Sequence, residues 1–351
     1  DRTESRSRPE IEAMLDAVVA TEREPDVVQL SGGEPTIHPE FFEILRSAKS
    51  RPIRHLMVNT NGIRLAREPG FAEALAREGP GLEIYLQFDS LRPEALHALR
   101  GADLLRVREA ALDALDRVGL STTLVVTLRR GVNDDEVGSL IRYAATRPCV
   151  RGITFQPVQD AGRNEGATPH ARRLTVSEIR RRIAESGLFT LADVIPVPCN
   201  PDALAMAYAL RTGGSLTPLT RHLPPEVLLG GPENTIAFER IPGLGERLFG
   251  ALSTGHSPES AAQSLGEVLC CLPRIQSGAL SYRDVFRVLV VRFMDAEDFD
   301  VRAVKRSCVH IAQPDGRLIP FEPFNLFYRP GARGPLAAIR SELETLWAGR
   351  R

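Results

Sequence analysis

The sequence lacks several features that would assign it at once to a class of protein. Its 44 Lys and Arg residues nearly balance its 45 Asp and Glu residues, giving a formal net charge of -1. That balance does not favour a nucleic-acid or anionic-membrane partner. No apolar run is long enough to cross a bilayer, because Arg287 and Arg292 interrupt the most apolar segment, 285–294. The first dozen residues are highly charged, unlike a signal peptide. In other respects the composition is that of an ordinary globular protein.

Cysteine is also scarce. The 351 residues contain five cysteines, and no two of them form a CxxC pair. The five are Cys149, Cys199, Cys270, Cys271 and Cys308. An odd number in a chain of this length does not predict a disulfide framework, so we expect a reducing compartment such as the cytoplasm. Because the chain begins with Asp1 and not Met, we expect it to be a processed form or a fragment.

Strand and helix patterns alternate through the first half of the chain. Apolar runs predict strands that start near residues 27, 55, 83, 121 and 152, and periodic apolar stripes predict helices between them. Steps of roughly thirty residues are typical of βαβ units. The strands are apolar without strict alternation, which predicts burial on both faces. The fold class is therefore α/β with a parallel sheet, either a (β/α) barrel or a doubly wound sheet.

The regular alternation ends at about residue 160. Residues 160–173 are polar and predict a surface loop, and a capped helix follows over 175–186. We expect residues 1–189 to form the sheet domain and 190–351 to form an added α+β region that packs on it. Within that region Pro314-Asp315-Gly316 predicts a hairpin turn, and residues 336–347 predict a helix.

Polar residues follow the predicted strands where those strands end. In parallel α/β folds, ligands bind at the carboxyl ends of the strands. The candidate binding residues are Ser31, Gly32, Gly33, Glu34, Asn59, Asn61, Asp89, Ser90 and Gln156. Polar groups at one strand end mean little, but their recurrence after several strands predicts a site rimmed by hydrogen-bonding side chains.

Gly32, Gly33 and Glu34 suggest what such a site would hold. Glycines without Cβ let a ligand lie against the backbone, and an adjacent carboxylate favours a cation. A phosphate-binding loop would instead need a Gly-Lys-Ser/Thr sequence and no acid. A ligand with an ammonium group, a ribose and an adenine suits the set, with Glu34 at the ammonium and Asn59, Asp89 or Ser90 at the ribose hydroxyls. The alternative, an ordinary turn between a strand and a helix, stays open at this point.

Five segments of the chain carry a family resemblance. They are VVQLSGGEPTIHPEFFEIL (27–45), HLMVNTNGIRLA (55–66), YLQFDSL (85–91), PVPCNPDALAMAYAL (196–210) and KRSCVHIAQPDGRLIPFEPFNLFYR (305–329). Together they resemble the radical S-adenosylmethionine (SAM) superfamily. Within it they resemble a branch that includes tetraether lipid synthases and pterin C-methylating enzymes.

The resemblance implies a fold and a chemistry. The fold would be a partial (β/α)6 TIM-like barrel, here without its first strand, with a C-terminal α+β extension. It would hold SAM and a [4Fe-4S] cluster, with Gly32, Gly33 and Glu34 at the methionine amine. Asn59, Asn61, Asp89 and Ser90 would contact the ribose and carboxylate. The reduced cluster would cleave SAM to a 5′-deoxyadenosyl radical that attacks an unactivated C–H bond. Methylation or C–C bond formation on a lipid or pterin-like substrate, with flavodoxin or ferredoxin as electron donor, would follow from the branch.

One departure from the family concerns the cluster. The family's CxxxCxxC motif is absent from this sequence, and we expect its cysteines upstream of Asp1, so that this chain alone would be inactive. The alternative is a degenerate barrel without a cluster that acts as a SAM-type binding or scaffold module. Cys199 and Cys308 are candidate ligands of an auxiliary centre, against buried structural thiols as the other interpretation. Cys149 is expected to be a packing residue.

Overall fold

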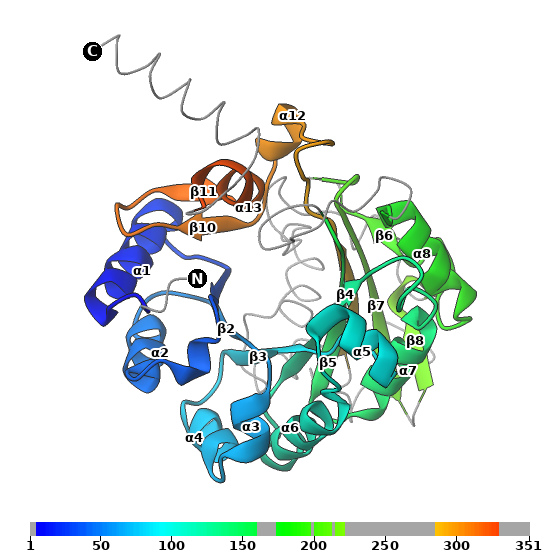
Figure 1. Ribbon diagram of the computed structural model, residues 1–351, viewed down its shortest axis with the longest axis horizontal. Coiled ribbons are helices and arrows are strands. Elements are labelled where there is room, and N and C mark those ends of the chain that lie inside the picture. Colours follow the sequence, from blue (N-terminus) through cyan, green and yellow to red (C-terminus); the bar gives the residue numbers. More distant parts are fainter. Residues whose placement is uncertain (1–4, 160–172, 198–199, 213–214, 222–284, 330–351) are drawn as a thin grey trace.

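A curved, mostly parallel β-sheet forms the centre of the protein in a computed structural model that describes residues 5–159, 173–197, 200–212, 215–221 and 285–329 (Figure 1). Its strands are β1 (Val27–Leu30), β2 (His55–Thr60), β3 (Leu82–Gln87), β4 (Thr122–Leu128), β5 (Val150–Pro157), β6 (Ile195–Pro196), β7 (Leu204–Thr212), β8 (Ser215–Pro218) and β9 (Val285–Val291). Their order is β1-β2-β3-β4-β5-β9-β7-β6, with β8 beside β7. Strands β1 to β5 and β9 are parallel, and β6, β7 and β8 run antiparallel to their neighbours. The α/β class and the five predicted strands are confirmed.

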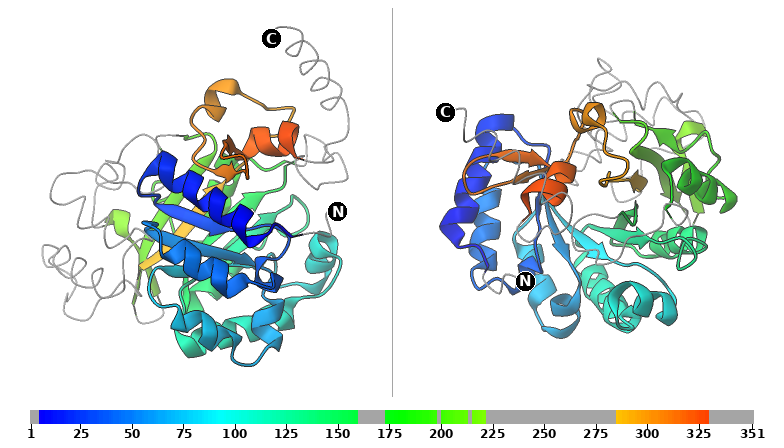
Figure 2. Two further views of the ribbon diagram at one scale, coloured as in Figure 1. Left: turned by 90° about the vertical axis from the view of Figure 1, so that its left-hand side faces the viewer. Right: turned by 45° about the horizontal axis from the view of Figure 1, so that its top comes forward.

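Helices surround the outside of the curved sheet (Figures 1 and 2). They are α1 (Arg8–Glu22), α2 (Phe41–Lys49), α3 (Ile63–Arg67), α4 (Phe71–Arg77), α5 (Pro93–Arg100), α6 (Leu105–Val118), α7 (Val137–Thr146) and α8 (Val176–Glu185). Local sequence explains two of the starts, because Ser7 with Glu10 and Thr175 with Glu178 form capping boxes at α1 and α8. The sequence analysis did not predict α3 and α5, which are only five and eight residues long.

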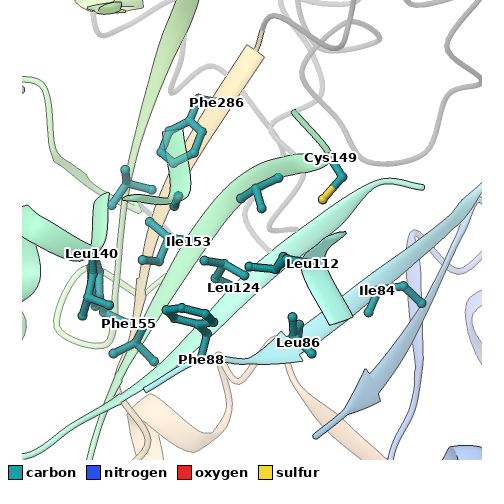
Figure 3. Close-up of a cluster of buried hydrophobic side chains, with 14 of the residues drawn as sticks. Ile84, Leu86, Phe88, Leu112, Leu124, Leu140, Cys149, Ile153, Phe155 and Phe286 are labelled. Atoms are coloured by element: carbon teal, nitrogen blue, oxygen red, sulfur yellow. The ribbon is translucent and has the colours of Figure 1, made fainter. Parts of the chain in front are cut away.

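The outer faces of the strands form one apolar core with these helices. Figure 3 shows part of that core, in which Phe88, Leu124 and Phe155 lie among side chains from neighbouring elements. Ten of its residues are labelled there: Ile84, Leu86, Phe88, Leu112, Leu124, Leu140, Cys149, Ile153, Phe155 and Phe286. Cys149 is 1% exposed within this core, so its expected packing role is confirmed.

The opposite, inner face of the sheet carries polar residues at alternate positions. Along β3, Glu83, Tyr85 and Gln87 alternate with core residues at 84, 86 and 88. Because successive side chains of a strand point to opposite faces, these three share the inner face. The expectation that the strands lack alternation is wrong for β3. One face of β3 packs in the apolar core, and the other face carries polar side chains.

The described part of 190–351 mostly continues the sheet. Strands β6, β7, β8 and β9 belong to it, and β9 is the apolar segment at 285–294 that the sequence analysis did not assign to a strand. Among the described residues the end strands β1 and β6 do not pair, so the sheet is open. The boundary at 189/190 stays a prediction.

The end of the described chain forms a small unit beside α1 (Figure 1). Strands β10 (His310–Ala312) and β11 (Leu318–Pro320) pair antiparallel, which confirms the predicted hairpin. Three short helical segments accompany it: α12 (Val301–Val304), α13 (Phe321–Pro323) and η6 (Phe324–Tyr328). Two 3-10 turns complete the described elements, η1 (Pro35–Ile37) and η3 (Leu219–Arg221). The helix predicted over 336–347 and most of the loop predicted over 160–173 lie outside the described residues. No described helix is long and apolar enough to cross a membrane.

Candidate functional site

Glu34 links two loops at the carboxyl edge of the sheet. Its Oε1 accepts hydrogen bonds from Thr36 N (3.2 Å), Thr36 Oγ1 (2.5 Å) and Thr60 Oγ1 (2.8 Å). Its Oε2 accepts one from Asn61 N (2.7 Å). The carboxylate therefore caps the turn at η1 and fixes the loop after β2 to the loop after β1. Because a carboxylate oxygen can accept two hydrogen bonds, Oε2 keeps capacity for one further donor, which an ammonium group can supply.

Open space lies over the two glycines that precede Glu34. A Cβ built on Gly32 or Gly33 would meet nothing within 4 Å, and both residues are exposed. Gly62, in the next loop, is the opposite case: its Cβ would lie 2.7 Å from Leu86 Cδ1, and its φ is +79°. Close packing explains why position 62 needs a glycine, whereas no packing among the described residues explains the glycines at 32 and 33. A ligand lying against the backbone would explain them.

Asn59 and Ser31 stand beside these glycines. Asn59 Nδ2 lies 3.5 Å from Ser31 Oγ, and Asn59 Oδ1 is buried without a hydrogen-bond partner among the described residues. Asn61 Oδ1 accepts from Ile63 N at 2.9 Å, which caps α3. The structure therefore brings Ser31, Asn59 and Asn61 together with Glu34 at one edge. A buried carbonyl oxygen without a partner is costly, and a ligand donor would satisfy it.

Asp89 and Ser90 are already paired with protein groups. Both are fully buried, and Asp89 makes a bidentate pair with Arg100 (Nε–Oδ2 2.7 Å, Nη2–Oδ1 2.9 Å). Arg108 Nη2 also lies 3.4 Å from Asp89 Oδ2, and Ser90 Oγ donates a hydrogen bond to Glu136. Burial alone would raise the pKa of Asp89, but the two guanidinium groups outweigh it and hold that pKa below its usual value. These partners hold the oxygens of Asp89 and Ser90 within the structure, and the assignment of the two residues to the ribose stays a prediction.

Gln156 lies on the inner face, and it marks a set of residues that the sequence analysis missed. Its Nε2 donates to the hydroxyl of Tyr85 at 3.3 Å. Thr154, two residues earlier on the same strand, is 1% exposed and adjoins the same hydroxyl. Its hydroxyl forms a side-chain hydrogen bond with that phenol, which lowers the pKa of Tyr85 against the larger raising effect of burial. The signal that could have found them is the alternation of polar and apolar residues along β3 and β5.

A charged cluster closes the opposite end of the inner face. We call His55, Glu83, Thr123 and Arg287 the floor cluster. His55 Nε2 lies 3.0 Å from Glu83 Oε2, and Arg287 Nη2 lies 3.5 Å from Glu83 Oε1 and 3.3 Å from Thr123 Oγ1. Burial raises the pKa of Glu83, but the hydrogen bond with His55 and the charge of Arg287 outweigh it and lower the pKa to about 2. The floor cluster therefore carries a permanent carboxylate at neutral pH.

The described residues do not fit an iron–sulfur cluster. No three His, Cys, Asp or Glu side chains among them come together as metal ligands. Cys308 is partly exposed near β10, with its thiol directed to Arg306 O at 3.5 Å. The other candidate ligand, Cys199, lies outside the described residues, as do Cys270 and Cys271. The assignment of Cys199 and Cys308 to an auxiliary centre stays a prediction.

A surface cavity of about 770 Å³ adjoins the same loops on their helix side. Glu34, Asn61 and Arg64 line it, together with residues of η1, α2 and α3. Ser31, Gly32, Gly33 and Asn59 do not line it. Because it misses the glycines and the inner face, we do not assign this cavity to the site.

Comparison with known proteins identifies a family model, curated relatives and a solved structure that this chain resembles. The radical SAM superfamily model matches residues 1–144. The chain is 30% identical over 340 residues to a 7,8-dihydro-6-hydroxymethylpterin dimethyltransferase of Methanocaldococcus jannaschii, covering 86% of this chain and 67% of that relative. It is 34% identical over 123 residues to a GTP 3',8-cyclase of Cronobacter sakazakii, covering 34% of this chain and 36% of that relative. A solved structure of native anSMEcpe with bound AdoMet and the Kp18Cys peptide matches at a TM-score of 0.38 and 17% identity, covering 51% of this chain and 49% of that one.

Proposed function

Because this chain belongs to the radical SAM superfamily, a superfamily of enzymes, we propose that it binds SAM at the carboxyl edge of its sheet and uses SAM to functionalise an unactivated C–H bond. The observation that supports this most is the open backbone at Gly32 and Gly33 beside Glu34. The methionine end of SAM carries an ammonium group that suits the remaining acceptor capacity of Glu34 Oε2. It also suits Asn59 Oδ1, which has no hydrogen-bond partner among the described residues.

The residues of the edge have separable tasks in this proposal. Gly32 and Gly33 admit the ligand to the backbone, and Glu34 holds the two loops in register while it accepts from the ammonium. Ser31, Asn59 and Asn61 supply hydroxyl and amide groups for the ribose and the carboxylate. The floor cluster, at the far end of the inner face, keeps bulk water from entering there, which protects reactive species.

The cofactor set includes a [4Fe-4S] cluster, and its ligands lie outside the described residues in this proposal. When bound, the cluster supplies the electron that makes SAM a source of radicals. A small flavodoxin or ferredoxin is the proposed electron donor, and the cytoplasm is the proposed compartment.

The proposed substrate is a pterin-like heterocycle, and the proposed outcome is methylation. The support is the pterin dimethyltransferase relative, whose similarity extends over 86% of this chain and so includes the strands after β5. The polar inner face also suits a hydrogen-bonding ring better than the alkyl chain of a lipid.

The test uses the product of the whole gene, purified and reconstituted with iron and sulfide without oxygen. With SAM and dithionite, we expect 5′-deoxyadenosine, detected by liquid chromatography and mass spectrometry. Adding 7,8-dihydro-6-hydroxymethylpterin should increase that product and yield a methylated pterin. A protein that binds four irons per chain yet never cleaves SAM would overturn the proposal in favour of a SAM-type binding module.

A further inference from the structure

The hydrogen bonds to Glu34 are divided unequally between its two carboxylate oxygens. Oε1 accepts three of them, from the backbone N–H of Thr36, the hydroxyl of Thr36 and the hydroxyl of Thr60. Oε2 accepts one, from the backbone N–H of Asn61. Because each carboxylate oxygen has about two lone pairs for hydrogen bonds, Oε1 is fully occupied, whereas Oε2 has room for one further donor. The protein thus holds the carboxylate by one oxygen and leaves capacity on the other.

The two threonine hydroxyls that hold Oε1 are shielded from solvent. Thr36 and Thr60 are each 1% exposed, so bulk water does not compete with either hydroxyl for Glu34. Thr60 Oγ1 also accepts a hydrogen bond from the backbone N–H of Gly62 at 3.2 Å. A hydroxyl that accepts from the backbone on one side and donates to a carboxylate on the other has a fixed orientation. Thr60 therefore acts as a rigid donor.

The backbone around each threonine is itself held in place. At Gly62, φ is +79° and an added Cβ would lie 2.7 Å from Leu86 Cδ1, so the loop that follows Thr60 has little freedom. The guanidinium of Arg64 donates a hydrogen bond to the carbonyl oxygen of Thr36. The same guanidinium stacks over the ring of Phe71, with Cζ 4.2 Å from the ring centre. Both hydroxyl donors therefore have fixed positions relative to Glu34.

Stabilising the fold does not require this arrangement of hydroxyls. Capping the turn at η1 needs only the bond from Thr36 N to Glu34. A buried threonine that serves the fold alone can bond a backbone carbonyl, as Thr122 Oγ1 does with Leu120 O at 3.1 Å. Thr36 and Thr60, from two different loops, instead donate to one oxygen of the same partly exposed carboxylate. Their common feature is the orientation of Glu34.

We infer that Thr36 and Thr60 are positioning residues that act through Glu34 and set the preference of the site for a ligand with a primary ammonium group. By occupying Oε1 they leave Oε2 as the acceptor for the ligand. They also order the carboxylate in advance, so the ligand does not have to order it on binding. This inference rests on the proposed function and deepens it, because it assigns ligand specificity to two buried residues that do not themselves contact SAM.

The test compares Thr36→Val and Thr60→Val, which keep the side-chain shape and remove the hydroxyl, in the reconstituted whole-gene product. Equilibrium dialysis gives the dissociation constants of SAM and of an analogue in which hydrogen replaces the α-amino group. Each variant should weaken SAM binding about fivefold, the effect of having to order one side chain on binding, and leave binding of the analogue unchanged. Thr36→Ser and Thr60→Ser, which keep the hydroxyl, should bind SAM like the wild type.

The matched control is Thr122→Val. Thr122 is also fully buried, and it lies at the start of β4, at the end of the sheet opposite the proposed SAM edge. This variant loses a buried hydroxyl as the others do, and it should leave the dissociation constants of both ligands unchanged. The thermal unfolding temperature of every variant is measured alongside. If one of the two test variants does not fold, the other, which lies in a different loop, provides the same comparison.

A double-mutant cycle with Glu34→Gln determines whether the threonines act through Glu34. Glu34→Gln should reduce the preference for SAM over the amine-free analogue. Adding Thr60→Val to it should then change that preference no further, because the carboxylate that Thr60 orients is already gone. An unchanged effect of Thr60→Val in the Glu34→Gln protein would show that Thr60 acts independently of Glu34, and would overturn the inference.

The remaining outcomes separate this inference from the proposed function. If the valine variants weaken binding of SAM and of the analogue equally, or bind both like Thr122→Val, the inference is overturned while the proposed function stands. If the wild type cleaves SAM but the serine variants lose SAM affinity as the valine variants do, the hydroxyls are not responsible and the inference is again overturned. If the wild type neither binds nor cleaves SAM, the proposed function fails and the inference fails with it.

Discussion

Arg287 of β9 forms an ion pair with Glu83 of β3, with 3.5 Å between Nη2 and Oε1, although β4 and β5 lie between their strands. Gly152 on β5 makes the crossing possible, since a Cβ there would lie 2.6 Å from the carbonyl oxygen of Arg287. The pair requires a strongly curved sheet. It ties β9 to β3 at the end of the inner face that lies opposite the proposed SAM edge.

Lowering the pH should weaken the contribution of Glu83 to stability. Its pKa of about 2 in the folded protein lies below the value of about 4.3 in an unfolded chain. A depressed pKa gives stability that is complete above the unfolded value and is lost as the pH falls toward the folded value. By urea unfolding, the stability difference between wild type and Glu83→Gln should shrink by about 1 kcal/mol between pH 6 and pH 3.5. A difference that stays constant over that range would contradict the assignment.

Replacing Asp89 should destabilise the fold strongly. Asp89→Asn leaves the 1% exposed Arg108 and the paired Arg100 without their carboxylate, and breaking a buried pair costs about 3–5 kcal/mol. The free energy of unfolding in urea measures the loss. The control is Glu73→Gln, which breaks a surface pair with Arg117 at 39% and 65% side-chain exposure and should cost under about 1 kcal/mol. Equal losses in the two variants would show that Asp89 does not hold the structure as described.

Two glycine variants should separate binding from folding. Gly33→Ala places its methyl group in open space, so the free energy of unfolding should change by less than about 0.5 kcal/mol. Its SAM affinity, measured by equilibrium dialysis on the reconstituted protein, should fall about tenfold, or about 1.4 kcal/mol. Gly62→Ala meets Leu86 and a left-handed backbone, so it should lose about 1–3 kcal/mol of stability. A Gly33→Ala protein with wild-type SAM affinity would remove the glycines from the site.

Thiol labelling should distinguish Cys149 from Cys308. Burial and the neighbouring Asp116 raise the pKa of Cys149 to about 12, and it is 1% exposed, so almost no thiolate is available at pH 8. Cys308 is partly exposed. Iodoacetamide followed by peptide mass spectrometry should modify Cys308 at least tenfold faster in the folded protein. Rapid labelling of Cys149 without unfolding would contradict its place in the core.

Local patterns in the sequence determined much of the fold and one half of the candidate site. Apolar runs at steps of about thirty residues located β1 to β5, and Ser7 and Thr175 marked two helix starts through capping boxes. The sequence GGE beside TNG indicated an edge where glycines and an acid meet. These features depend on neighbours in the chain, which a sequence displays directly.

Contacts between distant residues decided the rest. Asp89 is a candidate for the ribose because its carboxylate is polar. Only the tertiary structure shows that this carboxylate forms ion pairs with Arg100 and Arg108. Tyr85 and Gln156 are 71 positions apart, and Arg287 and Glu83 are 204 apart. Their meeting depends on the curvature of a nine-stranded sheet, in which β9 inserts between β5 and β7. Which polar residues serve a ligand and which hold the fold is therefore settled by burial and partner geometry, because the chemical group is the same in both cases.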